Sequence, residues 1–427
     1  MPYDVAFTRG LYSSLSDGWI YLNGQSAPQI PEKVSSAVAT AFRTSAQIVD
    51  PEPVSGSHSR ALQQGLLAGS HHVVSARKAI ADLVGARPDC VFLGPNRESM
   101  VASFIRAMRR RVMRPGSGAV LTSSLSSSVY DVALDAVGAH GGVGVQGGIG
   151  AQGVQGPVDV RVALADLGSG YVDEHQFTDL VDGSTRLVVI PAAHSLVGTV
   201  TDVPAIAEIV RSKSRAWTLV DASMLAPYRP ISFETLGVDA LVVDCAAFGG
   251  PQVAALVLRD TSMLQRLEPV GGSLEHGALS SGLLGGVSAM ADHLASLGGE
   301  PTGTRRRRLA RALEATATYV DELNEQLLFA LQNLSHVHVV GVSGDAVDSP
   351  PPAGRIGRVS FVVPGVDADT VHRRLLNNGV VTEVNPPDRL LEAMGAQEAG
   401  GSVSVGLAPY NTAADITALA RALASLG

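Results

Sequence analysis

Lysine is scarce in this 427-residue sequence. Three lysines occur, Lys33, Lys78 and Lys213, so 32 − 3 = 29 of the basic residues are arginines. Each lysine lies in a stretch with helical spacing of apolar residues and is interpreted as a surface charge. A reaction that requires an amine therefore has only three candidates, and none of them lies in an obvious turn.

Cysteine is nearly absent as well. Cys90 and Cys245 both stand in short apolar runs, which favours buried reduced thiols over a disulfide framework or a metal site. No cysteine follows Cys245, so the rest of the chain cannot supply a thiolate nucleophile. These two cysteines indicate a reducing compartment, and we expect a cytoplasmic protein.

Long apolar runs and excess positive charge are missing too. No stretch of about 18 apolar residues could span a membrane, and the N-terminus lacks a signal-peptide pattern. The net charge of -8 excludes a global attraction to nucleic acid or to anionic lipid. Two basic runs, 109–111 and 305–308, lie in helical patterns and are interpreted as solvated faces in preference to phosphate-binding patches. We expect no nucleic-acid partner, no membrane partner and no metal.

Short apolar runs alternate with helical patterns through the first two thirds of the chain. The runs are "CVFLG", "GAVLTS", "VRVALAD", "TRLVVIPAA", "AWTLVDAS", "DALVVDCAA" and "VAALVLRD". They predict a mostly parallel, seven-stranded sheet with helices on both faces, in an α/β domain. The glycine-rich segment 141–156 lacks the features of a nucleotide-binding loop and is interpreted as a surface loop.

From about residue 304 the pattern changes to a long helix followed by two helices and short strands, one of which is "VVTEV" (380–384). This predicts a smaller α+β domain at the C-terminus. We therefore divide the chain into an N-terminal segment (1–20), a large domain (21–270) and a small domain (271–427).

Three motifs together resemble those of a known protein family. They are "LVVIPAAHSLVGTVTDV", the strand and turn "LVVDAS…DALVVDCAAFGGPQVAALVLRD" that follows it, and "YNT" near the C-terminus. With these motifs the chain resembles the class V aminotransferase and cysteine desulfurase family, most closely an actinobacterial, cysteine desulfurase-like branch. Such a resemblance implies the fold of fold-type I proteins, which bind pyridoxal phosphate, form homodimers and build their sites between both domains and the partner subunit. It also implies that Asp221 is the carboxylate on the cofactor's ring nitrogen, although a strand-end aspartate in an α/β crevice is the alternative.

The residue that should form the Schiff base is missing from the matching position. Relatives carry a His-Lys pair four residues before the proline of "GGP", and here this pair falls on Ala246 and Ala247. Alanine can neither form an imine nor move a proton. The resemblance therefore identifies no catalytic residue in this chain.

Other positions implied by the resemblance also differ. The ring-stacking histidine falls on Ser124, the ring-oxygen asparagine on Ser195, and the Gln or His three residues after the aspartate on Met224. The arginine that should clamp a substrate carboxylate falls on Ser404, which loses the bidentate charge-assisted pair.

The resemblance also implies a site for the cofactor's phosphate group, and the residues at its positions differ from those of relatives. Asn96 and Arg97 in "LGPNRES" stand where relatives place a Gly-Thr-Thr turn at a helix N-terminus, and a structural helix cap is the equal alternative. The partner-subunit Gly-Thr falls on Gly277 and Ala278, which loses a hydroxyl.

Two hypotheses follow. The first is a pseudoenzyme-like homodimeric scaffold or binding protein without Schiff-base catalysis, whose ligand or protein partner the sequence does not identify. The second is a transferase or lyase that binds pyridoxal phosphate non-covalently through Asp221, Asn96, Arg97 and Ser195. The fold analogy by itself does not decide between them.

Overall fold

The computed structural model describes residues 3–49, 66–138, 158–275, 279–299, 302–342 and 351–426. Segment 141–156 lies outside these ranges, as do Gly277 and Ala278. Within them, no helix is both long and apolar enough to cross a membrane.

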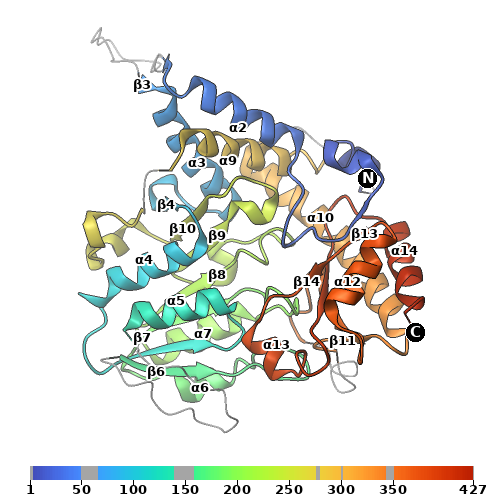
Figure 1. The fold of residues 1–427 in the computed structure, drawn as a ribbon. Helices are drawn as coiled ribbons and strands as arrows, with labels where there is room; N and C mark the ends of the chain where they lie inside the picture. The colour runs from blue at the N-terminus through green and yellow to red at the C-terminus, as the bar shows by residue number, and fades with distance from the viewer. Residues whose placement is uncertain are drawn as a thin grey trace.

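A seven-stranded sheet in the order β4-β10-β9-β8-β7-β5-β6 forms the centre of the larger part (Figure 1). Neighbouring strands are parallel except that β10 runs antiparallel to both β4 and β9. Each of the seven predicted runs forms one strand, so the predicted fold class is confirmed. The strands are β4 (Val91–Gly94), β5 (Ser117–Thr122), β6 (Val158–Ala163), β7 (Thr185–Pro191), β8 (Trp217–Asp221), β9 (Ala240–Asp244) and β10 (Ala254–Leu258).

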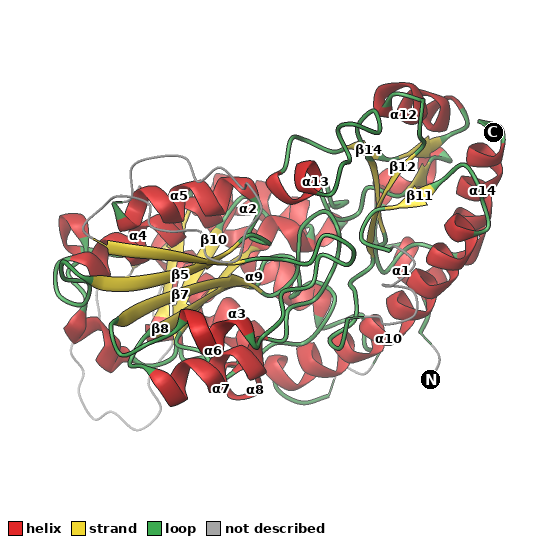
Figure 2. Cartoon of the chain, turned by 90° about the horizontal axis from the view of Figure 1, so that it is seen from below, coloured by secondary structure: helices red, strands yellow, loops and turns green. Residues whose placement is uncertain are grey.

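Helices cover both faces of this sheet (Figure 2). Side chains along a strand alternate between faces, so in β5 the side chains of Ala119 and Leu121 join one apolar cluster and that of Val120 joins the other. All three are fully buried, and each large apolar side chain removed from water contributes about 1.5–3 kcal/mol. One face carries α4 (Arg97–Arg109) and α5 (Ser127–Val137), and the other carries α6 (Gln176–Leu180), α7 (Val203–Lys213) and α8 (Phe233–Leu236).

The C-terminal part contains a four-stranded antiparallel sheet in the order β11-β12-β15-β14. Its strands are β11 (His338–Val339), β12 (Arg358–Val362), β14 (Glu383–Val384) and β15 (Val403–Gly406), accompanied by α12 (Ala368–Asn377), α13 (Arg389–Ala393) and α14 (Ala413–Ala424). Thr412 and Asp415 form a capping box at the start of α14, which satisfies two N–H groups at that helix end.

The predicted strand "VVTEV" is divided. Its first half, β13 (Val380–Val381), pairs in parallel with β1 (Ile20–Tyr21), and its second half joins the small sheet as β14. The division arises because β13 finds its partner at the N-terminal end of the chain. The domain boundaries at residues 20 and 270 stay predictions, and this pairing crosses both of them.

A group of helices packs beside the large sheet: α2 (Glu32–Thr44), α3 (Ala68–Val84) and α9 (Ser281–Leu294), with α10 (Arg305–Gln332) along α3 and α9 (Figure 1). Glycines let α9 lie close to α2: a Cβ on Gly285 would lie 2.3 Å from the Ala41 Cβ. A two-stranded ribbon of β2 (Ile48–Val49) and β3 (Leu66–Leu67) lies next to α2 and α3. The short helix α1 (Val5–Arg9) lies near the start of α14, where Arg9 is 3.6 Å from Asp415.

Candidate ligand-binding crevice

The carboxyl ends of β4, β5, β7, β8 and β9 meet at one edge of the large sheet, because these strands share one direction. Open α/β sheets bind ligands at this edge. A cavity of about 370 Å³ opens there. Its lining combines residues after these strands with residues of the segment between β1 and α2 and residues of β14 and the loop that follows it. They are Gln25, Ser26, Arg97, Ser126, Ser127, Ser128, Ser195, Leu196, Met224, Glu383, Pro386, Pro387 and Asp388.

Asp221 lies at the end of β8 and is 4% exposed. One carboxylate oxygen, Oδ1, accepts the backbone N–H of Ser223 at 3.1 Å. The other, Oδ2, accepts Nη1 of Arg97 at 3.3 Å. The carboxylate that the resemblance assigns to a cofactor ring nitrogen is therefore already paired with a guanidinium inside this chain.

Arg97 lies in the first turn of α4 and bridges two carboxylates. Besides Asp221, its Nε donates to Oε1 of Glu98 at 3.2 Å. Burial alone would lower the pKa of Arg97, but the carboxylates of Asp221, Glu98 and Asp244 outweigh it and raise that pKa. Its guanidinium therefore stays charged and matches the local negative charge.

Asn96 is the N-cap of α4, and its Oδ1 accepts the backbone N–H of Ser99 at 2.8 Å and the Ser99 hydroxyl. This is the structural role that the sequence left as an alternative, and it occupies the side-chain oxygen. Ser195 and Met224 do line the cavity. Ser124 is 2% exposed and donates to Thr122 Oγ1 at 3.3 Å, and it is not among the residues that line the cavity.

The turn between β9 and β10 carries the two alanines. Asp244 accepts the N–H of Ala246 at 2.9 Å, and Gly249 takes a positive φ of 71° at the end of the short 3-10 helix Cys245–Phe248. A Cβ on Gly249 would lie 2.5 Å from the carbonyl oxygen of Gln29, so a side chain is excluded there. Ala247 lines a different, mainly apolar cavity of about 40 Å³, together with Phe248.

A buried arginine that the sequence analysis did not identify lies near the predicted clamp position. Ser404 on β15 faces Ser360 on β12, with their hydroxyl oxygens 3.1 Å apart. Two residues along β12, Arg358 is 1% exposed and donates to Ser26 Oγ at 2.7 Å and to Glu383 Oε2 at 3.2 Å. Its Nε has no partner among the described atoms. A cation is thus present on the neighbouring strand, although it is engaged by Glu383.

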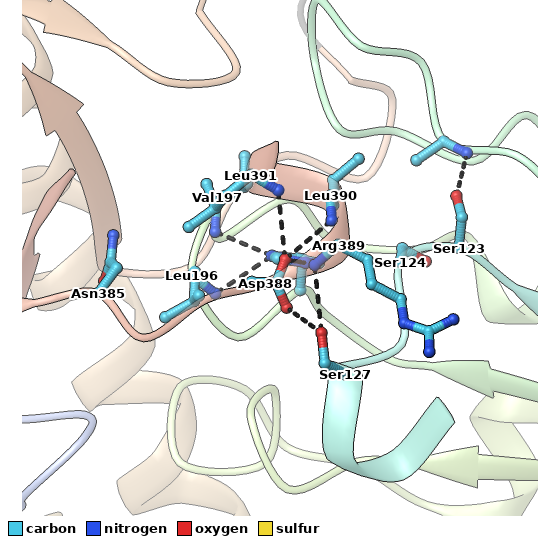
Figure 3. Close-up of polar contacts among 12 residues, drawn as sticks. Ser123, Ser124, Ser127, Leu196, Val197, Asn385, Asp388, Arg389, Leu390 and Leu391 are labelled. Atoms are coloured by element: carbon cyan, nitrogen blue, oxygen red, sulfur yellow. Dashed lines mark hydrogen bonds and ion pairs between the residues drawn. The ribbon is translucent and has the colours of Figure 1, made fainter. Parts of the chain in front are cut away.

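Asp388 lines the cavity from the small-domain side, and Figure 3 shows its polar contacts. Its Oδ1 caps α13 by accepting the N–H groups of Leu390 at 3.0 Å and Leu391 at 3.3 Å. Its Oδ2 accepts the hydroxyl of Ser127, at the start of α5, at 3.2 Å. The carboxylate therefore joins the small-domain loop to the large domain. The signal in the sequence was an aspartate after "NPP" and before two leucines, which is a helix N-cap pattern.

His194 lies on the other side of this carboxylate and is 1% exposed. Its Nδ1 accepts the N–H groups of Leu196 at 3.2 Å and Val197 at 3.0 Å, which assigns the ring proton to Nε2, 3.5 Å from Asp388 Oδ1. Burial alone would raise the pKa of Asp388, but His194 and the cap N–H groups outweigh it and lower that pKa. The Ser127 hydroxyl donates to Asp388, and Nδ1 of His194 accepts backbone N–H groups. Ser127, His194 and Asp388 are therefore not arranged as a Ser-His-Asp catalytic triad.

Both cysteines are buried and free, as the sequence predicted. Burial raises the pKa of Cys90 to about 11 and also raises the pKa of Cys245. Neither is a thiolate near neutral pH. Three exposed or partly exposed side chains, Asp173, Glu174 and His175, could approach one metal ion. They belong to a loop after β6 and line no part of the crevice.

The crevice residues do not fit an aldehyde cofactor held through a lysine. The ring-nitrogen carboxylate is bound by Arg97, the lysine position is Ala247, and the crevice lining contains no lysine. All three lysines lie in the described ranges: Lys213 donates to the Thr178 carbonyl at the end of α7, and Lys33 and Lys78 line a separate cavity.

Comparisons with known proteins agree on the family. Residues 154–419 match the model of the family described as aminotransferase class-V. An uncharacterized protein of Mycobacterium tuberculosis is 34% identical over the full length of both chains. A probable cysteine desulfurase of Methanothermobacter thermautotrophicus is 27% identical over 62% of this chain and 66% of its own.

Solved structures agree on the fold. The apo cysteine desulfurase of Thermococcus onnurineus covers 100% of this chain and 98% of its own with a TM-score of 0.77 at 16% identity. A lysine-to-alanine mutant of C-DES, with glycine covalently linked to its PLP cofactor, has a TM-score of 0.72 at 17% identity and covers 98% of this chain and 99% of its own. The family model, the full-length relative and the shared fold together establish that this chain belongs to the class V aminotransferase family.

Proposed function

We propose that this family member binds a ligand without forming a Schiff base, as a homodimeric scaffold or binding protein. The observation that carries the proposal is the buried contact between Arg97 Nη1 and Asp221 Oδ2 at 3.3 Å. A guanidinium at this carboxylate takes the place of a protonated ring nitrogen, so Asp221 has a cationic partner without a cofactor.

Alanine at positions 246 and 247 supports the same proposal, since no side chain there can condense with an aldehyde. The high pKa of both thiols removes the nucleophile that a desulfurase requires. What the crevice retains is a hydroxyl-rich lining suited to binding: five serines, the Gln25 amide and Arg97.

Homodimer formation is the second part of the proposal. Five large apolar side chains are exposed on α2, the β2–β3 ribbon and α3: Phe42, Ile48, Val49, Leu67 and Val74. Grouped apolar side chains on a surface mark interaction sites, and a second copy of the same chain is the commonest partner in soluble assemblies.

An absorbance experiment tests the absence of a Schiff base. The purified protein is incubated with excess pyridoxal phosphate, and one half is treated with borohydride while the other is left untreated. Both samples are desalted, and their absorbance is recorded from roughly 300 to 500 nm, where the cofactor and its imines absorb. We expect no reduced adduct on the wild-type protein. The matched positive control is Ala247→Lys combined with Arg97→Met, which restores an amine and frees Asp221. A single reduced lysine in the wild-type protein, located by peptide mapping among the three candidates, contradicts the proposal.

The alternative is a transferase or lyase that holds the cofactor non-covalently. It is favoured by the C-DES structure, in which an amino acid is linked to the cofactor of a protein that has lost a lysine. This alternative predicts that unreduced cofactor stays with the wild-type protein after desalting and that Asp221→Asn abolishes its retention. Our proposal predicts loss of the cofactor on desalting in both proteins.

A further inference from the structure

A second cavity, of about 870 Å³, lies among α2, α3, α9 and the first turn of α10 and shares no lining residue with the crevice. The four helices that form it are neighbours in Figure 1. Two of the three lysines of the chain line it, Lys33 from α2 and Lys78 from α3. In a chain with so few lysines, their convergence on one cavity from separate helices requires explanation.

The charges of this cavity do not cancel. Arg305 donates from Nε to Asp82 at 2.8 Å and lies 3.6 Å from Asp292 through Nη1. Both lining carboxylates are thereby engaged, while Lys33 and Lys78 have no ion pair or hydrogen bond in the described part of the chain. With neutral histidines, three cations and two carboxylates leave 3 − 2 = +1.

Two buried polar atoms of the lining are also without partners among the described residues: Nε2 of His72 and Oγ of Ser288. Burial, with His71 adding to it, lowers the pKa of His72, so its imidazole is neutral at pH 7 and can donate one hydrogen bond. A buried polar group without a partner costs about 1–3 kcal/mol. A polar ligand in the cavity would satisfy both atoms.

The first turn of α10 adds positive potential at the same place. Residues 305–308 are four consecutive arginines, and this turn contains no acidic residue. The N-terminus of a helix carries partial positive charge and normally attracts acidic side chains, each favourable by about 0.3–1 kcal/mol. Arginines there oppose folding, and a bound anion would offset this cost.

We propose that this cavity binds a phosphorylated small molecule, whose phosphate is held by Lys33, Lys78 and the positive end of α10. Phosphate is favoured over carboxylate because the two free cations are ammonium groups, which bind phosphate as point charges. The guanidinium fork that matches a carboxylate belongs here to Arg305, which Asp82 and Asp292 already engage. The volume leaves room for an organic group beside the phosphate.

Titration calorimetry of the full chain with inorganic pyrophosphate at low ionic strength tests the site. We expect saturable binding that Lys33→Gln and Lys78→Gln each weaken about fivefold, as loss of one charge contact implies. Lys213→Gln is the matched control, because Lys213 lies on α7 outside the cavity, and it should leave the affinity unchanged. The proposal is overturned if pyrophosphate does not bind or if all three variants weaken binding equally.

A variant that should bind pyrophosphate more tightly is a second test, because a damaged fold would weaken binding and could not produce this result. Asp292→Asn removes a partly exposed carboxylate from the lining and changes the charge sum from +1 to +2. It should strengthen pyrophosphate binding about threefold, and the gain should shrink as salt is added. Unchanged or weaker binding at low salt argues against an electrostatic site in this cavity.

Discussion

At the scale of single residues, the Asp221–Arg97 pair is the contact on which the crevice depends. The two side chains are 5% and 15% exposed. Removing one partner of a buried pair leaves an unpaired charge and costs about 3–5 kcal/mol. We therefore expect Arg97→Met to lower the free energy of unfolding by roughly 3 kcal/mol, and Asp221→Asn in the Arg97→Met background to recover most of it. Urea denaturation of the wild-type protein, of Arg97→Met, of Asp221→Asn and of the double variant measures the coupling, and strictly additive losses would contradict a direct pair.

His293 gives a pH-dependent prediction. Its imidazole is buried on α9, its Nε2 lies 2.9 Å from the Tyr12 hydroxyl, and burial lowers its pKa from 6.5 to about 4. Since the unfolded chain takes up the proton first, the contribution of His293 is complete above pH 6.5 and is lost as the pH falls towards 4. The difference between the two pKa values of His293, 6.5 − 4 = 2.5, limits this loss of unfolding free energy to about 3 kcal/mol.

Denaturant unfolding at pH 7.5 and at pH 5 checks this, with His293→Gln as the comparison. The variant has no group that titrates at this position, so its stability should fall less than that of the wild-type protein over the same interval. Equal losses in both proteins would assign the acid sensitivity to other groups, such as the carboxylates.

At the scale of elements, the packing of α9 on α2 depends on glycine. A Cβ on Gly285 would lie 2.3 Å from the Ala41 Cβ, which cannot move without its backbone, whereas a Cβ on Gly282 would meet the ring of Phe42, which is 54% exposed. Alanine in a helix interior gains about 1 kcal/mol over glycine, but overpacking costs about 1–3 kcal/mol. We expect Gly285→Ala to destabilise the protein and Gly282→Ala to be neutral or stabilising, as thermal unfolding would show. The reverse order would mean that α9 can shift away from α2.

The sequence predicted the elements of the large sheet well because their causes are local. Runs of β-branched and other apolar residues specify buried strands, Pro31 marks the start of α2, and Gly85 ends α3 with a φ of 69°. It did not predict that "VVTEV" divides, because the partner of β13 is a strand at the other end of the chain.

The site was predicted in part for the same reason. Ser195, Met224 and Arg97 line the crevice, while their roles in binding a cofactor stay predictions. However, Arg97 binds Asp221, which lies 124 residues away, and Asn96 is used as a helix cap. Asp388 and Arg358 were missed because their partners come from other elements, Ser127 on α5 and Ser26 before α2. Pairings of this kind depend on tertiary packing and leave no periodic pattern.

At the scale of the whole molecule, we predict that a second copy of the chain covers the exposed apolar side chains of α2, the β2–β3 ribbon and α3. Val74 is 62% exposed on α3, so Val74→Asp places a charge in this surface without disturbing the core of the monomer. The wild-type protein should sediment as a dimer and the variant as a monomer at micromolar concentration. Phe329→Asp is the control, because Phe329 is 71% exposed on the distant part of α10. Dimers that resist Val74→Asp but dissociate with Phe329→Asp would place the interface on α10.

The parallel pairing of β1 with β13 has a consequence for biosynthesis. Ile20 lies opposite Val380, 380 − 20 = 360 residues later, so a ribosome releases nearly the whole chain before this pair can form. Until then the first strand emerges with its backbone groups unpaired, and closing so long a loop makes this among the slowest native contacts. Nascent chains arrested before residue 380 should therefore leave the N-terminal segment open to proteases or chaperones, even after the large sheet has folded.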